Sequence, residues 1–147
     1  MCVFCKINSW EIPSYKIWEN EKFIAFLDLY PNCEGQTLVI PKKHYDSDLF
    51  SIWDKELYKD IILATDEVVQ ILKQKLAVQR VGMIVEWLWV NHLHIKLYPM
   101  HGLEKERKEN IWWETVFFQE YPGYLTTEIW NQAEAEKLQR IQEKITN

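Results

Sequence analysis

Residues 22–41, KFIAFLDLYPNCEGQTLVIP, contain two short apolar runs separated by residues typical of a turn. The run Lys22–Asp28 predicts a β-strand, because aromatic and β-branched residues dominate it. A second strand is predicted at Gln36–Ile40, and the intervening Pro31 and Gly35 favour a turn. Because the connection is short, we expect the two strands to form an antiparallel hairpin.

The next segment changes from a strand pattern to a helix pattern. Apolar residues recur every three or four positions between residues 54 and 76, so they form one stripe along an amphipathic helix. Asp54 is a candidate N-cap, and Lys73 and Lys75 lie where the helix dipole favours positive charge. We therefore expect a long helix over residues 54–76.

Two further strands and a second helix follow. Val81–Glu86 and His92–Tyr98 predict strands, residues 87–91 between them are ambiguous, and Thr127 to about Ile145 predicts a helix. The order β-β-α-β-β-α, with hairpin-length connections, favours an α+β fold with an antiparallel sheet. The aromatic residues within 111–125 are expected to pack on the domain or on a partner.

Length and composition indicate one globular domain over residues 1–147. Hydrophobic residues make up 48% of the chain and charged residues 27%, which excludes a disordered protein. The net charge of −5 and the lack of a basic stripe in the sequence argue against nucleic acid as a partner. No run of the sequence approaches the roughly 20 apolar residues that a membrane helix needs. An odd number of cysteines, three, without a secretion signal indicates reduced thiols and a cytoplasmic location.

The strand that begins at His92 carries the strongest chemical signal. Because alternate side chains of a strand share a face, we expect His92, His94 and Lys96 on one side together with Tyr98. The three aliphatic residues between them then enter the core. Such a face can bind an anion, with one imidazole as nucleophile and the lysine cation beside it. The alternative is a pair of surface histidines on a half-exposed strand.

A second signal is the pair of thiols in Cys2-x-x-Cys5. Two free thiols, a redox pair and half of a zinc site are all compatible with this spacing. Since only one other cysteine remains, four-coordinate zinc would need histidine ligands as well. The candidate histidines are His44, His92 and His101.

Asp28, at the end of the first predicted strand, is a third candidate. A carboxylate at this place can accept hydrogen bonds from both hydroxyls of a ribose, as acidic residues do in other nucleotide sites. Alternatively, Asp28 starts the turn and accepts a hydrogen bond from its own backbone.

Several short motifs resemble those of the histidine triad (HIT) superfamily. They run in the right order over about residues 2–101, two-thirds of the chain, and comprise FCKI (4–7), EIPS (11–14), ENE (19–21), FLD (26–28), GQTLVIPKKH (35–44) and the strand from His92. Residues 1–101 are thus a motif-bearing core, and 102–147 a C-terminal extension that carries none of these motifs.

The resemblance implies an α+β fold with a five-stranded antiparallel sheet. Two copies would form a dimer with a continuous ten-stranded sheet and the helix at 54–76 at the interface. Proteins of this superfamily bind a purine nucleotide and hydrolyse or transfer at its α-phosphorus. The resemblance therefore implies a nucleotide or nucleotide conjugate as the ligand.

The resemblance also assigns roles to individual residues. His94 would attack phosphorus and form a nucleotidyl-histidine intermediate. Asp28 would hold the ribose, and Ile7, Phe23 and Leu27 would line the base pocket.

Members with a Cys-x-x-Cys opening also bind structural zinc. By position, the ligands here would be Cys2, Cys5, His44 and His92. His92 would then align the strand that presents His94.

Four positions near the expected nucleotide depart from the family pattern. Lys96 replaces the third histidine of the triad; a lysine does not exchange a proton near neutral pH as imidazole does, but it can stabilise phosphate charge. Gln36 stands where many members have a histidine beside the site. Leu88 and Trp89 lie where members usually have small or amide residues whose backbone approaches the phosphate.

Two functions follow from these matches and departures. The first is a zinc-stabilised nucleotide hydrolase or nucleotidyl transferase, with His94 as nucleophile and Lys96 as charge stabiliser. The second is a nucleotide-binding or scaffolding module of the same fold with little or no catalysis. A redox protein built on the two N-terminal thiols is disfavoured, because the pair does not lie at a strand-to-helix turn.

Overall fold

The computed structural model describes residues 2–85, 90–102 and Glu136. The chain divides into two compact units, Met1–Arg107 and Lys108–Asn147, and the helices and strands below all belong to the first. The predicted helix at 127–145, the aromatic segment 111–125, and Trp87 and Trp89 lie outside the described residues. A single domain over 1–147 stays a prediction.

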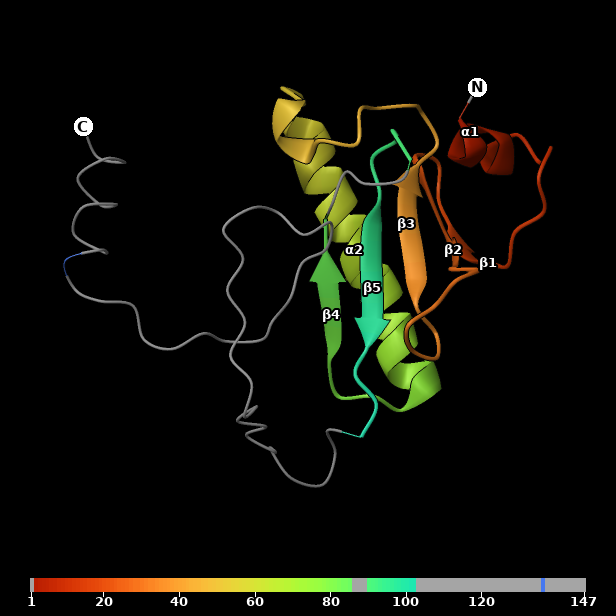
Figure 1. Cartoon of the computed structure of the whole chain (residues 1–147), viewed down its shortest axis with the longest axis vertical. Helices are drawn as coiled ribbons and strands as arrows, with labels where there is room; N and C mark the ends of the chain where they lie inside the picture. Colours follow the sequence, from red (N-terminus) through yellow and green to blue (C-terminus); the bar gives the residue numbers. More distant parts are fainter. Residues whose placement is uncertain (1, 86–89, 103–135, 137–147) are drawn as a thin grey trace. The chain divides into compact units, whose positions relative to one another are not determined.

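A five-stranded antiparallel sheet organises the first unit, with the strands in the order β1-β2-β3-β5-β4 (Figure 1). The strands are β1 (Lys16–Glu19), β2 (Phe23–Leu27), β3 (Thr37–Pro41), β4 (Val81–Ile84) and β5 (Ile95–Pro99). The helices are α1 (Val3–Asn8), a short 3-10 helix η1 (Leu49–Ser51) and the long α2 (Lys55–Leu76). The predicted α+β class, five-stranded antiparallel sheet and long helix are confirmed.

The hairpin of β2 and β3 has the expected position. Leu27 pairs with Thr37 at its closed end, and the Asp28 N–H donates to the Gln36 carbonyl beyond it. Gly35 has a φ of +77° in the turn, a conformation that glycine adopts without steric cost.

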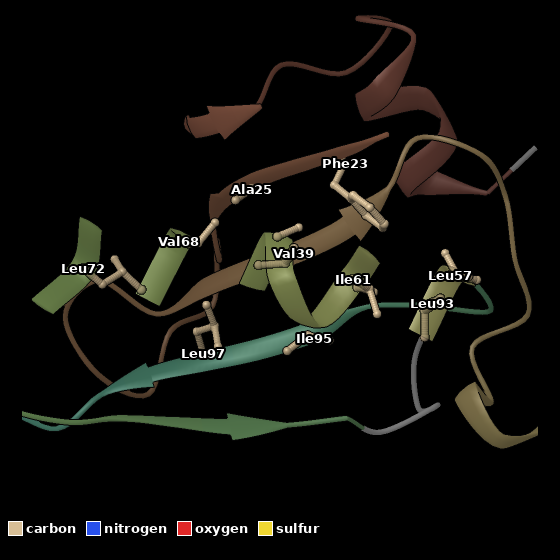
Figure 2. Close-up of a cluster of buried hydrophobic side chains, with 11 residues drawn as sticks. Phe23, Ala25, Val39, Leu57, Ile61, Val68, Leu72, Leu93, Ile95 and Leu97 are labelled. Atoms are coloured by element: carbon tan, nitrogen blue, oxygen red, sulfur yellow. The ribbon is translucent and has the colours of Figure 1, made fainter. Parts of the chain in front are cut away.

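Helix α2 begins where the sequence indicates. The Asp54 carboxylate accepts hydrogen bonds from the N–H groups of Glu56 and Leu57, both at 3.1 Å, and so caps the first turn. The apolar stripe of α2 packs on one face of the sheet. Figure 2 shows this core, which comprises Phe23, Ala25, Val39, Leu57, Ile61, Ala64, Val68, Leu72, Leu93, Ile95 and Leu97.

A second, smaller hydrophobic cluster is formed by the side chains of β2 and β3 that alternate with those packed against α2. Phe4 and Ile7 of α1 pack against Ile24, Phe26, Leu38 and Ile40. Because successive side chains of a strand point to opposite faces, these strands are buried on both sides. Sequence analysis did not locate α1 or β1 from the residues themselves.

Strand β5 begins at Ile95, three residues later than the prediction of a strand from His92. The backbone before it bonds elsewhere: the His92 N–H donates to the Val90 carbonyl and the Leu93 N–H to the Tyr45 carbonyl. These bonds replace a ladder with β3, whose last pair with β5 is Val39 with Ile95. Among the described residues, no helix is both long enough and apolar enough to cross a lipid bilayer.

Candidate active site and metal centre

Alternation along the segment from His92 divides its side chains between two environments. Leu93, Ile95 and Leu97 are fully buried in the core against α2, as predicted. The residues between them, on the other face, contribute to a metal-binding cluster and to a pocket. The expected separation of polar and apolar side chains is therefore observed.

Four side chains meet at the N-terminal end of this segment: Cys2, Cys5, His44 and His92. The two Sγ atoms are 3.1 Å apart, and the two Nδ1 atoms are 3.3 Å apart. The four distances between sulfur and nitrogen are 3.3 to 3.6 Å. All six distances in this set thus fall within a narrow range.

The cluster has the size and donor set of a tetrahedral zinc site. Zinc bonds of about 2.3 Å to sulfur and about 2.0–2.1 Å to nitrogen give a tetrahedron with edges of about 3.3–3.8 Å. Two thiolates and two imidazoles are a common ligand set for structural zinc. The four residues therefore fit zinc, and as four protein ligands they leave no coordination position for a substrate.

His92 is held in the form that a metal ligand requires. Its Nε2–H donates to the Pro41 carbonyl at 2.9 Å, so its Nδ1, which faces the cluster, carries the lone pair. Burial lowers the pKa of His92 and thus favours the neutral ring. Burial also raises the pKa of the Cys5 thiol, with further contributions from the Cys2 side chain.

His101, the other candidate ligand, does not join the cluster. Its Nε2–H donates to the Glu34 carbonyl at 2.9 Å, beyond the opposite end of β5.

A pocket of about 580 Å³ lies beside the metal-binding cluster and contains most of the predicted nucleotide-site residues. Of these predicted residues, Ile7, Leu27, Asp28, Gln36, His94 and Lys96 line it. Phe23 does not, because its parity in β2 directs it into the core against α2 (Figure 2). Trp89 lies outside the described residues.

His94 lines this pocket with a defined tautomer. Its Nδ1 lies 2.7 Å from the His92 carbonyl oxygen, which only accepts, so Nδ1 carries the hydrogen and Nε2 the lone pair. The Phe4 ring meets the imidazole edge-on, with 5.5 Å between ring centroids. The ring is thus fixed by a hydrogen bond and an aromatic contact.

Asp28 forms the turn, as one interpretation of the sequence predicted, and also lines the pocket, as the other requires. Its Oδ1 accepts the Tyr30 N–H at 2.9 Å, which is the turn-forming bond, and its Oδ2 accepts from the Gln36 side chain at 2.7 Å. The residue nevertheless lines the pocket, beside Tyr30 and Asn32.

Sequence analysis missed part of the pocket wall. Tyr98 lines the pocket, on the face where it was expected. The lining residues that were not predicted are Val3, Phe4, Pro13, Ser14, Phe26, Leu29, Tyr30, Asn32, Leu38 and Val90. Parity in the hairpin could have found Phe26 and Leu38, since they alternate with core residues. Of α1, only Ile7 was expected in this wall, through the family resemblance, and no local signal pointed to Val3 or Phe4.

Comparison with known proteins agrees with this geometry. The family model described as HIT domain matches residues 9–102, more than half of the chain. The chain belongs to the HIT family.

Relatives by sequence include an uncharacterised HIT-like protein of Methanocaldococcus jannaschii. It is 38% identical over 106 residues, which cover 69% of this chain and 80% of the relative. An adenosine 5'-monophosphoramidase of Candida albicans is 35% identical over 108 residues, covering 67% of this chain and 72% of that enzyme.

Solved structures show the same HIT fold. A HIT family member from Bacillus subtilis aligns with a TM-score of 0.68 and 25% identity, covering 99% of this chain and 94% of that one. A zinc-bound histidine triad family protein from Mycobacterium smegmatis aligns with a TM-score of 0.61 and 28% identity, covering 71% of this HIT chain and 78% of that one.

Proposed function

We propose that this HIT protein binds a purine nucleotide or nucleotide conjugate in the pocket and acts at its α-phosphorus through His94. The observation that carries this proposal is the His94 tautomer. Because Nδ1 donates to the His92 carbonyl, the lone pair needed for nucleophilic attack is on Nε2. The Candida albicans relative, named as an adenosine 5'-monophosphoramidase, supports nucleotide chemistry of this kind.

The reaction would proceed in two displacements. In the first, His94 Nε2 forms a bond to the α-phosphorus while the bond from phosphorus to the leaving group breaks; the leaving group takes the electron pair and, if it is an amine, a proton from solvent. In the second, water or another acceptor attacks phosphorus, the P–N bond breaks, and the imidazole regains its lone pair. When water is the acceptor, its proton passes to solvent.

Lys96 and Asp28 would bind the two polar parts of the nucleotide. Lys96 lines the same pocket as His94 and follows it by two residues, so its ammonium group can stabilise the phosphate oxygens. Asp28 accepts the ribose hydroxyls. The purine would lie among the apolar residues Ile7, Phe26 and Leu38.

The cluster of Cys2, Cys5, His44 and His92 would bind zinc in a structural role. When bound, zinc links α1 to the loops beside β3 and β5, and it supplies no chemistry to the substrate. His92 thereby holds the backbone carbonyl that fixes the His94 tautomer.

A homodimer with α2 at its interface is proposed on the same family resemblance. Ile62 and Leu63 of α2 have exposed fractions of 46% and 62% and would be covered in the dimer. Sedimentation at several protein concentrations tests this, and a monomer at all of them contradicts it.

Turnover assays test the enzymatic proposal. The purified protein is incubated with an adenosine 5'-phosphoramidate and, separately, with a dinucleoside polyphosphate, and AMP formation is followed by chromatography. We expect turnover of at least one substrate, its loss in His94→Ala, and its retention in the matched variant His101→Ala. Turnover unchanged in His94→Ala excludes His94 as nucleophile.

The alternative is a nucleotide-binding or scaffolding module, favoured by Lys96 and Gln36 in place of histidines. Calorimetric titration with AMP separates the two functions. Binding without turnover supports the module, and absence of both binding and turnover refutes the nucleotide site.

A further inference from the structure

Gln36 is a buried amide between two groups of the pocket wall. Only 3% of its surface is exposed, and it precedes β3 directly. Its Nε2 lies 2.7 Å from Asp28 Oδ2, and its Oε1 lies 2.7 Å from the Asn32 N–H nitrogen. All three residues line the pocket.

The two partners of Gln36 determine the orientation of its amide. A carboxylate accepts hydrogen bonds and a backbone N–H donates them, so the NH₂ group must face Asp28 and the carbonyl oxygen must face Asn32. The Asp28 N–H donates in turn to the Gln36 backbone carbonyl at 2.9 Å. Gln36 and Asp28 are therefore joined through both side chain and backbone.

These bonds determine how many further hydrogen bonds the Asp28 carboxylate can accept. A carboxylate has about four acceptor positions, two on each oxygen. The Tyr30 N–H occupies one on Oδ1, and Gln36 occupies one on Oδ2. Counting only partners among the described residues, about one position therefore remains on each oxygen, which matches the two hydroxyls of a ribose.

We propose that Gln36 is a positioning residue that holds Asp28 for both ribose hydroxyls and thereby sets a preference for ribonucleotides over 2'-deoxyribonucleotides. This inference rests on the proposed nucleotide site. Without the Gln36 amide, Asp28 Oδ2 loses its bond, and only the Tyr30 N–H to Oδ1 still holds the carboxylate, so Oδ2 is no longer held in place for a ribose hydroxyl. Asn32 is exposed, so water can satisfy its N–H and the turn itself needs no other partner.

Calorimetric titration of AMP and 2'-deoxyadenosine 5'-monophosphate tests the inference. We expect the wild-type protein to bind AMP about tenfold more tightly, the effect of one hydrogen bond to a charged group. Gln36→Leu, which keeps the side chain buried, should reduce this ratio to near unity while binding the deoxynucleotide almost as before. Gln36→Met, which has a similar length but no group that can donate to Asp28, should lose the preference as well.

A double-mutant cycle with Asp28→Ala separates positioning from a general structural effect. In the Asp28→Ala background, Gln36→Leu should change the ratio no further, because the two residues act through one carboxylate. A wild-type preference that persists in Gln36→Leu overturns the inference and leaves the nucleotide site intact. Equal wild-type affinities for the two nucleotides also overturn it. Wild-type protein that binds neither nucleotide refutes the proposed function itself.

Discussion

Loss of a zinc ligand should remove both the metal and a large part of the stability of this HIT domain. The variant Cys5→Ser replaces one thiolate of the metal-binding cluster with a hydroxyl, a poor zinc ligand. Zinc bound to the cluster connects residues separated by 39 and 48 positions along the chain, Cys5 with His44 and His44 with His92. Cross-linking loops of this length restricts the unfolded chain by about 4 kcal/mol each, if the disulfide relation is applied to a metal.

Loss of the metal releases both loops, so the release of one loop sets the lower limit of the effect. Each kcal/mol changes the melting temperature by about 3–5 °C in a domain of this length, so Cys5→Ser should melt at least roughly 12–20 °C lower. A chelator should lower the melting temperature of the wild-type protein comparably.

Metal analysis and thermal unfolding of purified protein provide the measurement. We expect about one zinc per chain in the wild type and in Cys33→Ser, and none in Cys5→Ser. Cys33 is a matched control, because it is also a partly buried free thiol but lies outside the cluster. Zinc retained in Cys5→Ser, or a wild-type melting temperature that a chelator leaves unchanged, would refute the assignment.

Three further predictions concern single residues. The side chains of two lysines donate hydrogen bonds to Glu19 and lower its pKa from 4.5 to about 2. The stability that Glu19 contributes is therefore present above pH 4.5 and is lost as the pH falls toward about 2. In Glu19→Gln, the free energy of unfolding measured in urea should depend less on pH within that window. Gly35→Ala should destabilise the fold by about 1–3 kcal/mol, because both its φ of +77° and a contact with Leu76 Cδ1 oppose a Cβ. Gly102 has a φ of +81° but open space around it, so Gly102→Ala should lower the free energy of unfolding by less in the same denaturation experiment. Equal losses in the two variants would show that the Leu76 contact does not contribute. Lys96→Met should weaken AMP binding about tenfold and leave adenosine binding unchanged in calorimetry, whereas an equal loss for both ligands would argue against a phosphate contact.

The elements that sequence analysis located are those whose pattern is long or whose caps are local. Helix α2 has a regular apolar stripe and an Asp54 cap, and the β2–β3 hairpin has apolar runs on both sides of a glycine turn. Helix α1 spans only six residues, too few for a period to be recognised. Its position depends on contacts with Phe26 and other distant residues, which no local signal encodes.

In the candidate site, too, features that depend on local sequence were predicted, and features that depend on distant contacts were not. Alternation from His92 to Tyr98 predicted which side chains share a face, because parity is a property of the strand alone. The assignment of Phe23 to the base pocket came from a loose positional match, and its parity places it on the helix-covered face instead. The bond between Gln36 and Asp28 joins residues eight positions apart and depends on how the turn folds.

His92 and His94 show how neighbouring residues of one type acquire different chemistry. The His92 ring donates from Nε2 to the Pro41 carbonyl and so presents Nδ1 to the two thiols, whereas the His94 ring donates from Nδ1 and keeps its lone pair on Nε2. The acceptor for His94 is the backbone carbonyl of His92 itself. Any change that moves His92, including loss of the metal, would therefore displace the carbonyl that keeps the His94 lone pair on Nε2. In the proposed mechanism, zinc would then influence the reaction without touching the substrate, because it would hold the backbone that fixes this tautomer.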